Sequence, residues 1–203
     1  MNIAIKIYNY LKKRTWIKKF GFFDMSSAIG EDGIGKGCKL SGFGRIIVGK
    51  DCYFGKGTEI TALENHFEQK LDANLIIKDH VRCVGGCRIT CAGNITLEDD
   101  VLLGPDVFIT DHNHGMNPTK KGGYSAQSLI IKDVVIKKGV WLGQRVCVLP
   151  GVTIGAHSII GANSVVTHDI PSYAIAVGAP ARVVKKWDKV RKKWVSIEGK
   201  ERR

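Results

Sequence analysis

An apolar residue occupies every sixth position over one stretch of this chain, and that period limits the folds open to it. The positions are Ile136, Leu142, Val148, Ile154, Ile160 and Val166. An α-helix repeats every 3.6 residues and a strand every 2, so a period of six fits neither element alone. It fits a coil of three short flat faces, in which one residue of each six points to a shared axis. Stacked coils then bury a continuous core that no single coil buries by itself.

The hexads extend beyond this block, with interruptions. They begin weakly near Ile29, and residues 64–74 break the rhythm as a small excursion. The register resumes, slips by two between Ile95 and Leu97, and stops at a long polar stretch over residues 111–133. Glycine and proline mark that stretch as a protruding loop, and loops of this length are usually functional.

We therefore predict one all-β solenoid domain over residues 29–182, with a different segment at each end. Residues 1–28 are basic and aromatic at near-helical spacing, which predicts a helix that caps the open coil or touches an anionic membrane. Residues 183–203 are also basic, and valines and tryptophans among the lysines predict an amphipathic C-terminal helix with a tail.

The composition restricts the partners. The chain has 203 residues, which suits one domain, and a formal net charge of +12. This balance favours anionic partners such as nucleic acid, anionic lipid or phosphorylated ligands. The charge is concentrated at the two ends, which argues against one nucleic-acid groove. The sequence has neither an apolar run of about 18 residues nor the pattern of a secretory signal, so we expect neither a membrane span nor secretion.

The six cysteines are explained by the hexad register. Cys38, Cys52 and Cys87 fall four places after an apolar corner, where small inward side chains pack, and Cys83 is itself a corner. The spacing of Cys83, Cys87 and Cys91 lacks the paired Cys-x-x-Cys of zinc sites. We therefore expect reduced core cysteines, no bound metal and a cytoplasmic protein, with any membrane association peripheral.

The densest cluster of reactive side chains is Asp111-His112-Asn113-His114, where a coil opens into the long loop. A histidine takes up a proton at neutral pH, and a neighbouring carboxylate orients it and raises its basicity. The alternative is a polar turn whose Asp and Asn satisfy backbone groups. Flanking motifs favour the chemical interpretation.

Three motifs follow the loop: VWLG at 140–143, NSVVTHDIP at 163–171 and AVGAPARV at 176–183. Together they resemble the hexapeptide-repeat acyltransferases, in particular the galactoside, maltose and polysaccharide O-acetyltransferase branch. The resemblance covers residues 75–187 well and residues 29–62 loosely. It implies a left-handed parallel β-helix, an exception to the usual right-handed crossover. It also implies a homotrimer with active sites between adjacent subunits, and acetyl-CoA as the acyl donor.

The resemblance places a histidine general base at the start of the loop, at His112 or His114. Counting from the corner Ile109 favours His114, whereas His112 adjoins Asp111, the candidate orienting carboxylate. The donor side maps to Trp141, Gly143, Gln144, Ala162, Thr167, His168, Arg182 and Lys185. Within this set a backbone N–H near Gly143 is expected to stabilise the oxyanion, and Arg182 and Lys185 to pair with phosphates.

These inferences predict an acetyl-CoA-dependent O-acetyltransferase that modifies a hydroxyl of a sugar or cell-surface polysaccharide intermediate by direct transfer. The family positions that contact a galactoside fall on Ala92 and near Val84, so a simple β-galactoside is not the expected acceptor. The first alternative is an N-acetyltransferase of an amino-sugar nucleotide. A second is a γ-carbonic-anhydrase-like metal lyase using the loop histidines with His66 and His80, and a third is a non-catalytic scaffold.

Overall fold

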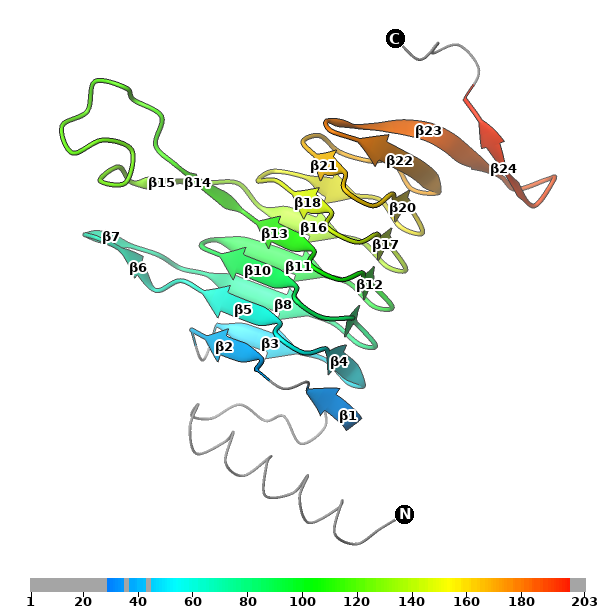
Figure 1. Ribbon diagram of the computed structural model, residues 1–203, viewed down its shortest axis with the longest axis horizontal. Helices are drawn as coiled ribbons and strands as arrows, with labels where there is room; N and C mark the ends of the chain where they lie inside the picture. Colours follow the sequence, from blue (N-terminus) through cyan, green and yellow to red (C-terminus); the bar gives the residue numbers. More distant parts are fainter. Residues whose placement is uncertain (1–28, 35–36, 43–44, 198–203) are drawn as a thin grey trace, which may run out of the picture.

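The chain winds as a three-sided coil of short parallel strands (Figure 1). The computed structural model describes residues 29–34, 37–42 and 45–197. One face is a nine-stranded sheet of β1 (Ile29–Ile34), β4 (Cys52–Phe54), β9 (Arg82–Cys83), β12 (Leu102–Leu103), β17 (Trp141–Leu142), β20 (Ile159–Ile160), β22 (Ala174–Gly178), β23 (Ala181–Asp188) and β24 (Lys193–Ser196). The second is a six-stranded sheet of β2 (Lys39–Ser41), β5 (Glu59–Ala62), β10 (Arg88–Cys91), β13 (Phe108–Thr110), β18 (Cys147–Val148) and β21 (Val165–Val166). The third is a five-stranded sheet of β3 (Ile46–Val48), β8 (Asn74–Ile77), β11 (Asn94–Leu97), β16 (Val134–Ile136) and β19 (Thr153–Ile154). The left-handed parallel β-helix is therefore confirmed.

The core follows the period of six. Ile136 pairs with Ile154, Leu142 with Ile160 and Val148 with Val166. The two residues of each pair are eighteen apart, and each pair lies on a different face of the coil. All six side chains are fully buried. Burying one such side chain contributes about 1.5–3 kcal/mol, so the stacked corners supply most of the stability of the coil.

The interruptions of the period gather at one corner, where the chain passes from the six-stranded to the five-stranded sheet. On one coil this corner carries the hairpin of β6 (Asn65–His66) and β7 (Gln69–Lys70). On the next coil it is only widened: Ile77 pairs with Leu97, twenty residues later, which accounts for the slip in register. On the third it carries the long loop, whose base is the antiparallel pair β14 (His112–His114) and β15 (Leu129–Ile131). Three departures from the hexad thus stack on one another.

The predicted C-terminal helix over residues 183–203 is wrong in its described part. Residues 181–188 and 193–196 are strands β23 and β24, which extend the nine-stranded sheet by antiparallel pairing. The open edge of β22 offers unpaired backbone groups to β23. Strands β23 and β24 form a two-stranded ribbon in which Trp187 faces Trp194. Cross-strand pairing therefore outweighs the helical spacing of these residues. The predicted N-terminal helix over residues 1–28 lies outside the described residues.

The cysteines pack as predicted. Cys52, Cys83 and Cys87 are buried in the core, as is Cys91, and Cys38 is partly buried against it. No disulfide joins the six cysteines, all of which lie in the described ranges. Across those ranges, no helix has the length and apolarity needed to cross a membrane.

Candidate active site

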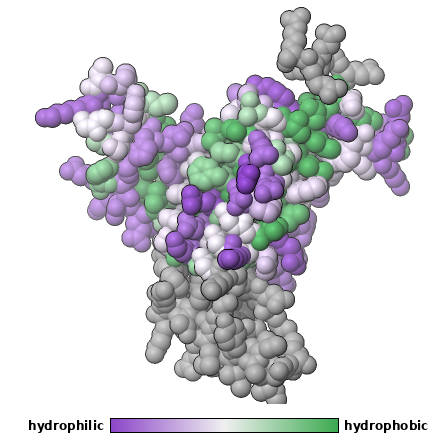
Figure 2. Space-filling view, in the orientation of Figure 1, coloured by the Kyte–Doolittle hydropathy of each residue, from purple (hydrophilic) through white to green (hydrophobic). Residues whose placement is uncertain are grey.

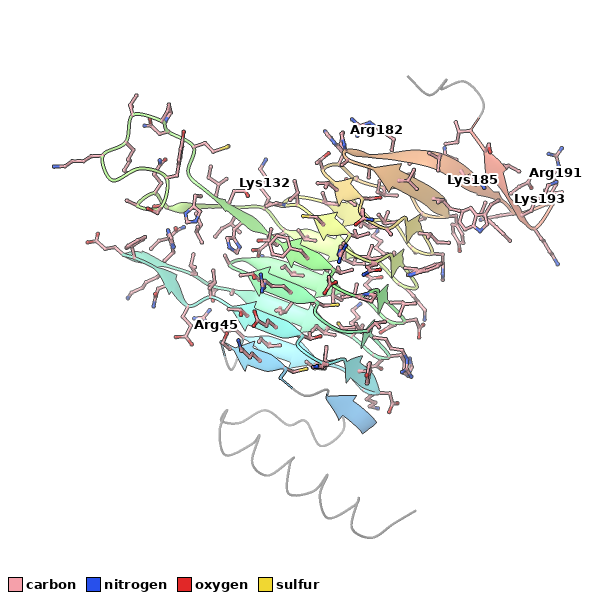
Figure 3. All side chains as sticks on the ribbon, viewed as in Figure 1. Arg45, Lys132, Arg182, Lys185, Arg191 and Lys193 are labelled. Carbon is pink, nitrogen blue, oxygen red and sulfur yellow. The ribbon has the colours of Figure 1, made fainter. Side chains whose placement is uncertain are left out.

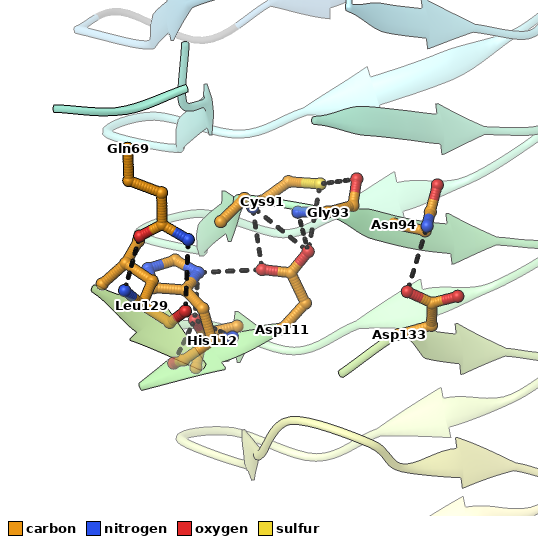
Figure 4. Close-up of polar contacts among 10 residues, drawn as sticks. Gln69, Cys91, Gly93, Asn94, Asp111, His112, Leu129 and Asp133 are labelled. Atoms are coloured by element: carbon orange, nitrogen blue, oxygen red, sulfur yellow. Dashed lines mark hydrogen bonds and ion pairs between the residues drawn. The ribbon is translucent and has the colours of Figure 1, made fainter. Parts of the chain in front are cut away.

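Asp111 is a fully buried carboxylate at the irregular corner. It follows β13, and its side chain turns toward the widened turn of the coil beside it (Figure 4). There its oxygens accept hydrogen bonds from the backbone N–H of Ala92 at 2.8 Å and of Gly93 at 2.7 Å. The Cys91 thiol donates at 3.4 Å. Ala92 and Gly93, the two residues inserted into the hexad, therefore provide N–H groups that bind a negative charge.

His112 completes this arrangement. Its ring Nδ1 lies 2.8 Å from Asp111 Oδ1, and its side chain is 15% exposed. Burial raises the pKa of the Asp111 carboxyl, but the hydrogen bonds donated to it outweigh burial and hold that pKa below its ordinary value. An ionised carboxylate only accepts hydrogen bonds, so Nδ1 carries the proton and Nε2 is left as an acceptor. A histidine held in this tautomer is suited to removing a proton from a substrate hydroxyl.

His114 has different surroundings. It lies two residues along β14 and is exposed, and its ring contacts His66 edge-on at 5.1 Å between centroids. Within the described part of the chain its ring makes no hydrogen bond to a carboxylate. The geometry thus favours His112 over His114, against the count from Ile109.

Two glutamines that the sequence reasoning missed hold the loop in place. The Gln69 amide pairs with the Leu129 peptide at both ends, accepting from its N–H at 2.7 Å and donating to its carbonyl at 3.3 Å (Figure 4). The Gln127 amide is buried and bonds Asn117 on both backbone groups at 2.9 Å. The β6–β7 hairpin therefore supports the base of the loop. The one sign of this role in the sequence is that residues 64–74 interrupt the hexads.

The predicted donor residues lie at other corners than His112. Trp141, half exposed, is on β17 of the nine-stranded sheet, and Gly143 and Gln144 follow it in the turn. Ala162 lies in the turn above, after β20, and a Cβ at Gly143 would approach the Ala162 nitrogen to 2.7 Å. The Gly143 N–H donates to the Ile160 carbonyl at 2.8 Å, so this N–H is already used within the coil. The next N–H, of Gln144, donates to no described residue.

The remaining donor candidates divide between two places. Thr167 and His168 follow β21 of the six-stranded sheet and bond each other at 2.7 Å between Oγ1 and Nδ1. Arg182 and Lys185 are exposed on β23, with Arg182 at its start and Lys185 farther along it, whereas Lys132 lies at the base of the loop (Figure 3). One chain therefore does not bring these residues to His112.

Of the histidines considered for a metal, His66 and His114 contact each other, whereas His80 lies apart from them. His80 lies at a different corner and bonds Asp100 at 3.1 Å. His66 Nε2 bonds the Gln127 carbonyl at 3.1 Å. Over the described ranges, no group of three or more histidine, cysteine or acidic side chains is arranged to hold a metal ion.

Comparison with known proteins identifies relatives. The family model "Bacterial transferase hexapeptide (six repeats)" matches residues 133–168. A protein of Escherichia coli (strain K12), named "Putative lipopolysaccharide biosynthesis O-acetyl transferase", is 32% identical over 163 residues, covering 77% of this chain and 80% of that protein.

Two solved structures are also similar. A hexapeptide-repeat acetyltransferase of Vibrio cholerae O1 biovar eltor, complexed with acetyl coenzyme A, is 32% identical with a TM-score of 0.51 over 55% of this chain and 61% of that one. A mutant N-acyltransferase of Bacillus cereus, in complex with coenzyme A and an amino-sugar nucleotide, is 20% identical with a TM-score of 0.63 over 88% of this chain and 91% of that one. The second match supports the fold alone.

Proposed function

Because this chain belongs to the hexapeptide-repeat acyltransferase family and is therefore an acyltransferase, we propose that it moves an acetyl group from acetyl-CoA to a hydroxyl of a sugar or polysaccharide intermediate. The observation that carries the proposal is the Asp111–His112 pair, a buried ionised carboxylate holding an imidazole at 2.8 Å. His112 Nε2 accepts the hydroxyl proton as the C–O bond forms, a contribution of about 10²–10⁴-fold to the rate. The thioester C–S bond then breaks, and the CoA sulfur leaves as the thiol with the proton that His112 returns.

The donor site is proposed at the corner that follows the nine-stranded sheet. Trp141 and Ala162 line it, and the unused Gln144 N–H is the proposed hydrogen-bond donor to the oxyanion. Arg182 and Lys185 supply cations for the phosphates of coenzyme A. Since one chain keeps this corner apart from His112, we propose that a neighbouring copy in a trimer closes each site.

O-acetylation is favoured over N-acetylation. The relative that covers most of this chain at 32% identity is named for O-acetyl transfer in lipopolysaccharide biosynthesis, whereas the N-acyltransferase is alike only in fold. We also propose a cytoplasmic location, a compartment in which cysteines packed in a core stay reduced.

The test pairs two histidine variants. Acetyl-CoA binding is measured calorimetrically, and acetyl transfer is measured against a panel of sugars, oligosaccharides and amino-sugar nucleotides. We expect His112→Asn to bind acetyl-CoA as the wild type does and to lose about 10²–10⁴-fold in kcat/KM, and His114→Asn to stay within tenfold. A severe loss only in the His114 variant overturns the assignment of the base, and transfer only to amines overturns O-acetylation.

A further inference from the structure

The β23–β24 ribbon carries a basic tip that acetyl transfer does not use. In Figure 1 the ribbon extends beyond the stack of coils and ends in a turn, where the Lys189 ammonium lies over the Tyr173 ring at 5.4 Å from its centroid. We define the ribbon tip as residues 189–193, which are the turn between the two strands and the first residue of β24. Arg191 and Lys193 lie at this end of the ribbon, whereas Arg182 lies at its start (Figure 3). The tip therefore lies at the opposite end of the ribbon from Arg182, with Lys185 between them on β23.

The tip is rigidly built. Trp187 and Trp194 pair across the ribbon with ring centroids 5.4 Å apart. Asp188 then caps the turn, because its Oδ1 accepts the N–H of Val190 and of Arg191, each at 2.9 Å. A turn fixed in this way presents its side chains without a large ordering cost on binding.

The charge at this end is strongly positive. Residues 188–193 contain four lysines and arginines and one acidic residue, a net +3, and the whole ribbon over residues 181–197 has a net +6. The one carboxylate, of Asp188, lies 3.7 Å from Arg191 and is thus already neutralised. Hydrophilic side chains gather at the end of the ribbon in Figure 2, over a more hydrophobic base.

An apolar side chain stands at the centre of this charge. Val190 is 93% exposed, the most exposed large hydrophobic side chain in the described ranges. The turn places it between Lys189 and Arg191, with Lys192 following. Nucleic acid or a free polyanion offers the cations partners but gives an outward valine nothing apolar to bury. An anionic lipid surface satisfies both, because its headgroups attract the cations and its interface accepts the apolar side chain.

We propose that the ribbon tip docks the protein on an anionic phospholipid bilayer. Each lysine near such a surface contributes about fivefold to the partition coefficient, so removing three is expected to lower it by about 100-fold. The attraction is also expected to weaken with added salt, since the Debye length is about 8 Å at physiological ionic strength.

The experiment is cosedimentation of the full chain with vesicles of phosphatidylcholine, with and without phosphatidylglycerol. The test variant is Lys189→Gln, Lys192→Gln, Lys193→Gln, and the matched control removes three exposed lysines of the coils, Lys50→Gln, Lys56→Gln, Lys137→Gln. We expect the wild type and control to bind only the anionic vesicles and the tip variant to bind about 100-fold more weakly. Val190→Ser is expected to weaken binding while leaving its salt dependence unchanged.

Acetyl-CoA affinity serves as the check that each variant is folded, and it separates this proposal from the proposed function. Equal vesicle binding by the tip variant and the control assigns membrane contact elsewhere and overturns the proposal. Absence of wild-type vesicle binding, with duplex DNA bound through the same three lysines, also overturns it and assigns the tip to a soluble polyanion.

Discussion

Replacing Asp111 by asparagine tests the central feature of the site, a buried charge held by donated hydrogen bonds. The wild-type carboxylate accepts from two backbone N–H groups, one thiol and the His112 ring, and none of its surface is exposed. An asparagine keeps one acceptor oxygen and turns an NH₂ group toward donors. Each buried donor left without a partner costs about 1–3 kcal/mol, so two such groups lower the free energy of unfolding by about 2–6 kcal/mol.

The loss in the free energy of unfolding caused by Asp111→Asn is expected to depend on pH in a defined direction. The folded-state pKa of Asp111 is lower than its unfolded value of about 3.9, so the ionised group stabilises the fold above that pH. This stability is lost as pH falls through the folded pKa, where the carboxyl becomes protonated. The difference in the free energy of unfolding between wild type and Asp111→Asn should therefore be largest near neutral pH and should shrink in acid.

Urea unfolding at neutral and acid pH, followed by circular dichroism, measures both effects. The matched control is Asp133→Asn, the same substitution at a nearby exposed carboxylate that accepts one bond from Asn94 at 3.0 Å. The control is expected to change stability by at most about 0.5 kcal/mol. A loss below about 1 kcal/mol for Asp111→Asn at neutral pH, or one that does not shrink in acid, would refute the picture of a buried charge held by its hydrogen bonds.

Three further outcomes follow from the same geometry. Gln69→Ala removes both hydrogen bonds to the Leu129 peptide, so amide hydrogen exchange at 127–131 should quicken while the coil stays protected; unchanged exchange contradicts the supporting role of the hairpin. Gly143→Ala places a Cβ against backbone atoms of the coil above and should cost about 1–3 kcal/mol, read from the melting temperature. Burial and Asp111 raise the pKa of Cys91 to about 12, so at pH 8 a disulfide reagent should label half-buried Cys147 before buried Cys91, and faster labelling of Cys91 argues against this.

The coil was predictable because its periodicity is set by geometry. Each face takes one hexad, so residues eighteen apart stack, and the pairing of Ile136 with Ile154 follows directly from the count. The C-terminal ribbon was mispredicted because Val183, Trp187 and Val190 also fit a helical spacing. Only the free edge of β22, which is a feature of the folded sheet, decides between helix and strand there.

The sequence indicates the residue types of the candidate site but not their arrangement. The cluster at 111–114 was evident from its residue types, yet the sequence count preferred His114. The register slip at residues 91–93 held the missing information, because the widened turn it produces supplies the N–H groups that bind Asp111. Irregularity in a repeat is thus the better guide to chemistry, and it identifies His112 as the residue oriented by that carboxylate.

The six-residue period also predicts which site residues lie at the same corner of the coil. Leu142 and Ile160 precede Gln144 and Ala162 on one face, while Ile109 precedes His112 on another. A single chain therefore presents the proposed base and the proposed donor site at separate corners, which is why we propose that a working site requires two copies. This requirement is testable by mixing two variants, His112→Asn and Trp141→Ala, each impaired alone.

If each site joins His112 of one copy to Trp141 of another, subunits mixed in equal amounts and reassembled at random form about one quarter intact sites. If both residues act within one chain, no mixed subunit carries an intact pair and activity stays at the level of the single variants. The measurement is acetyl transfer after unfolding the mixture and refolding it, with each variant refolded alone as the control. Recovery to about a quarter of refolded wild-type activity supports a shared site, and no recovery places the reaction within one chain.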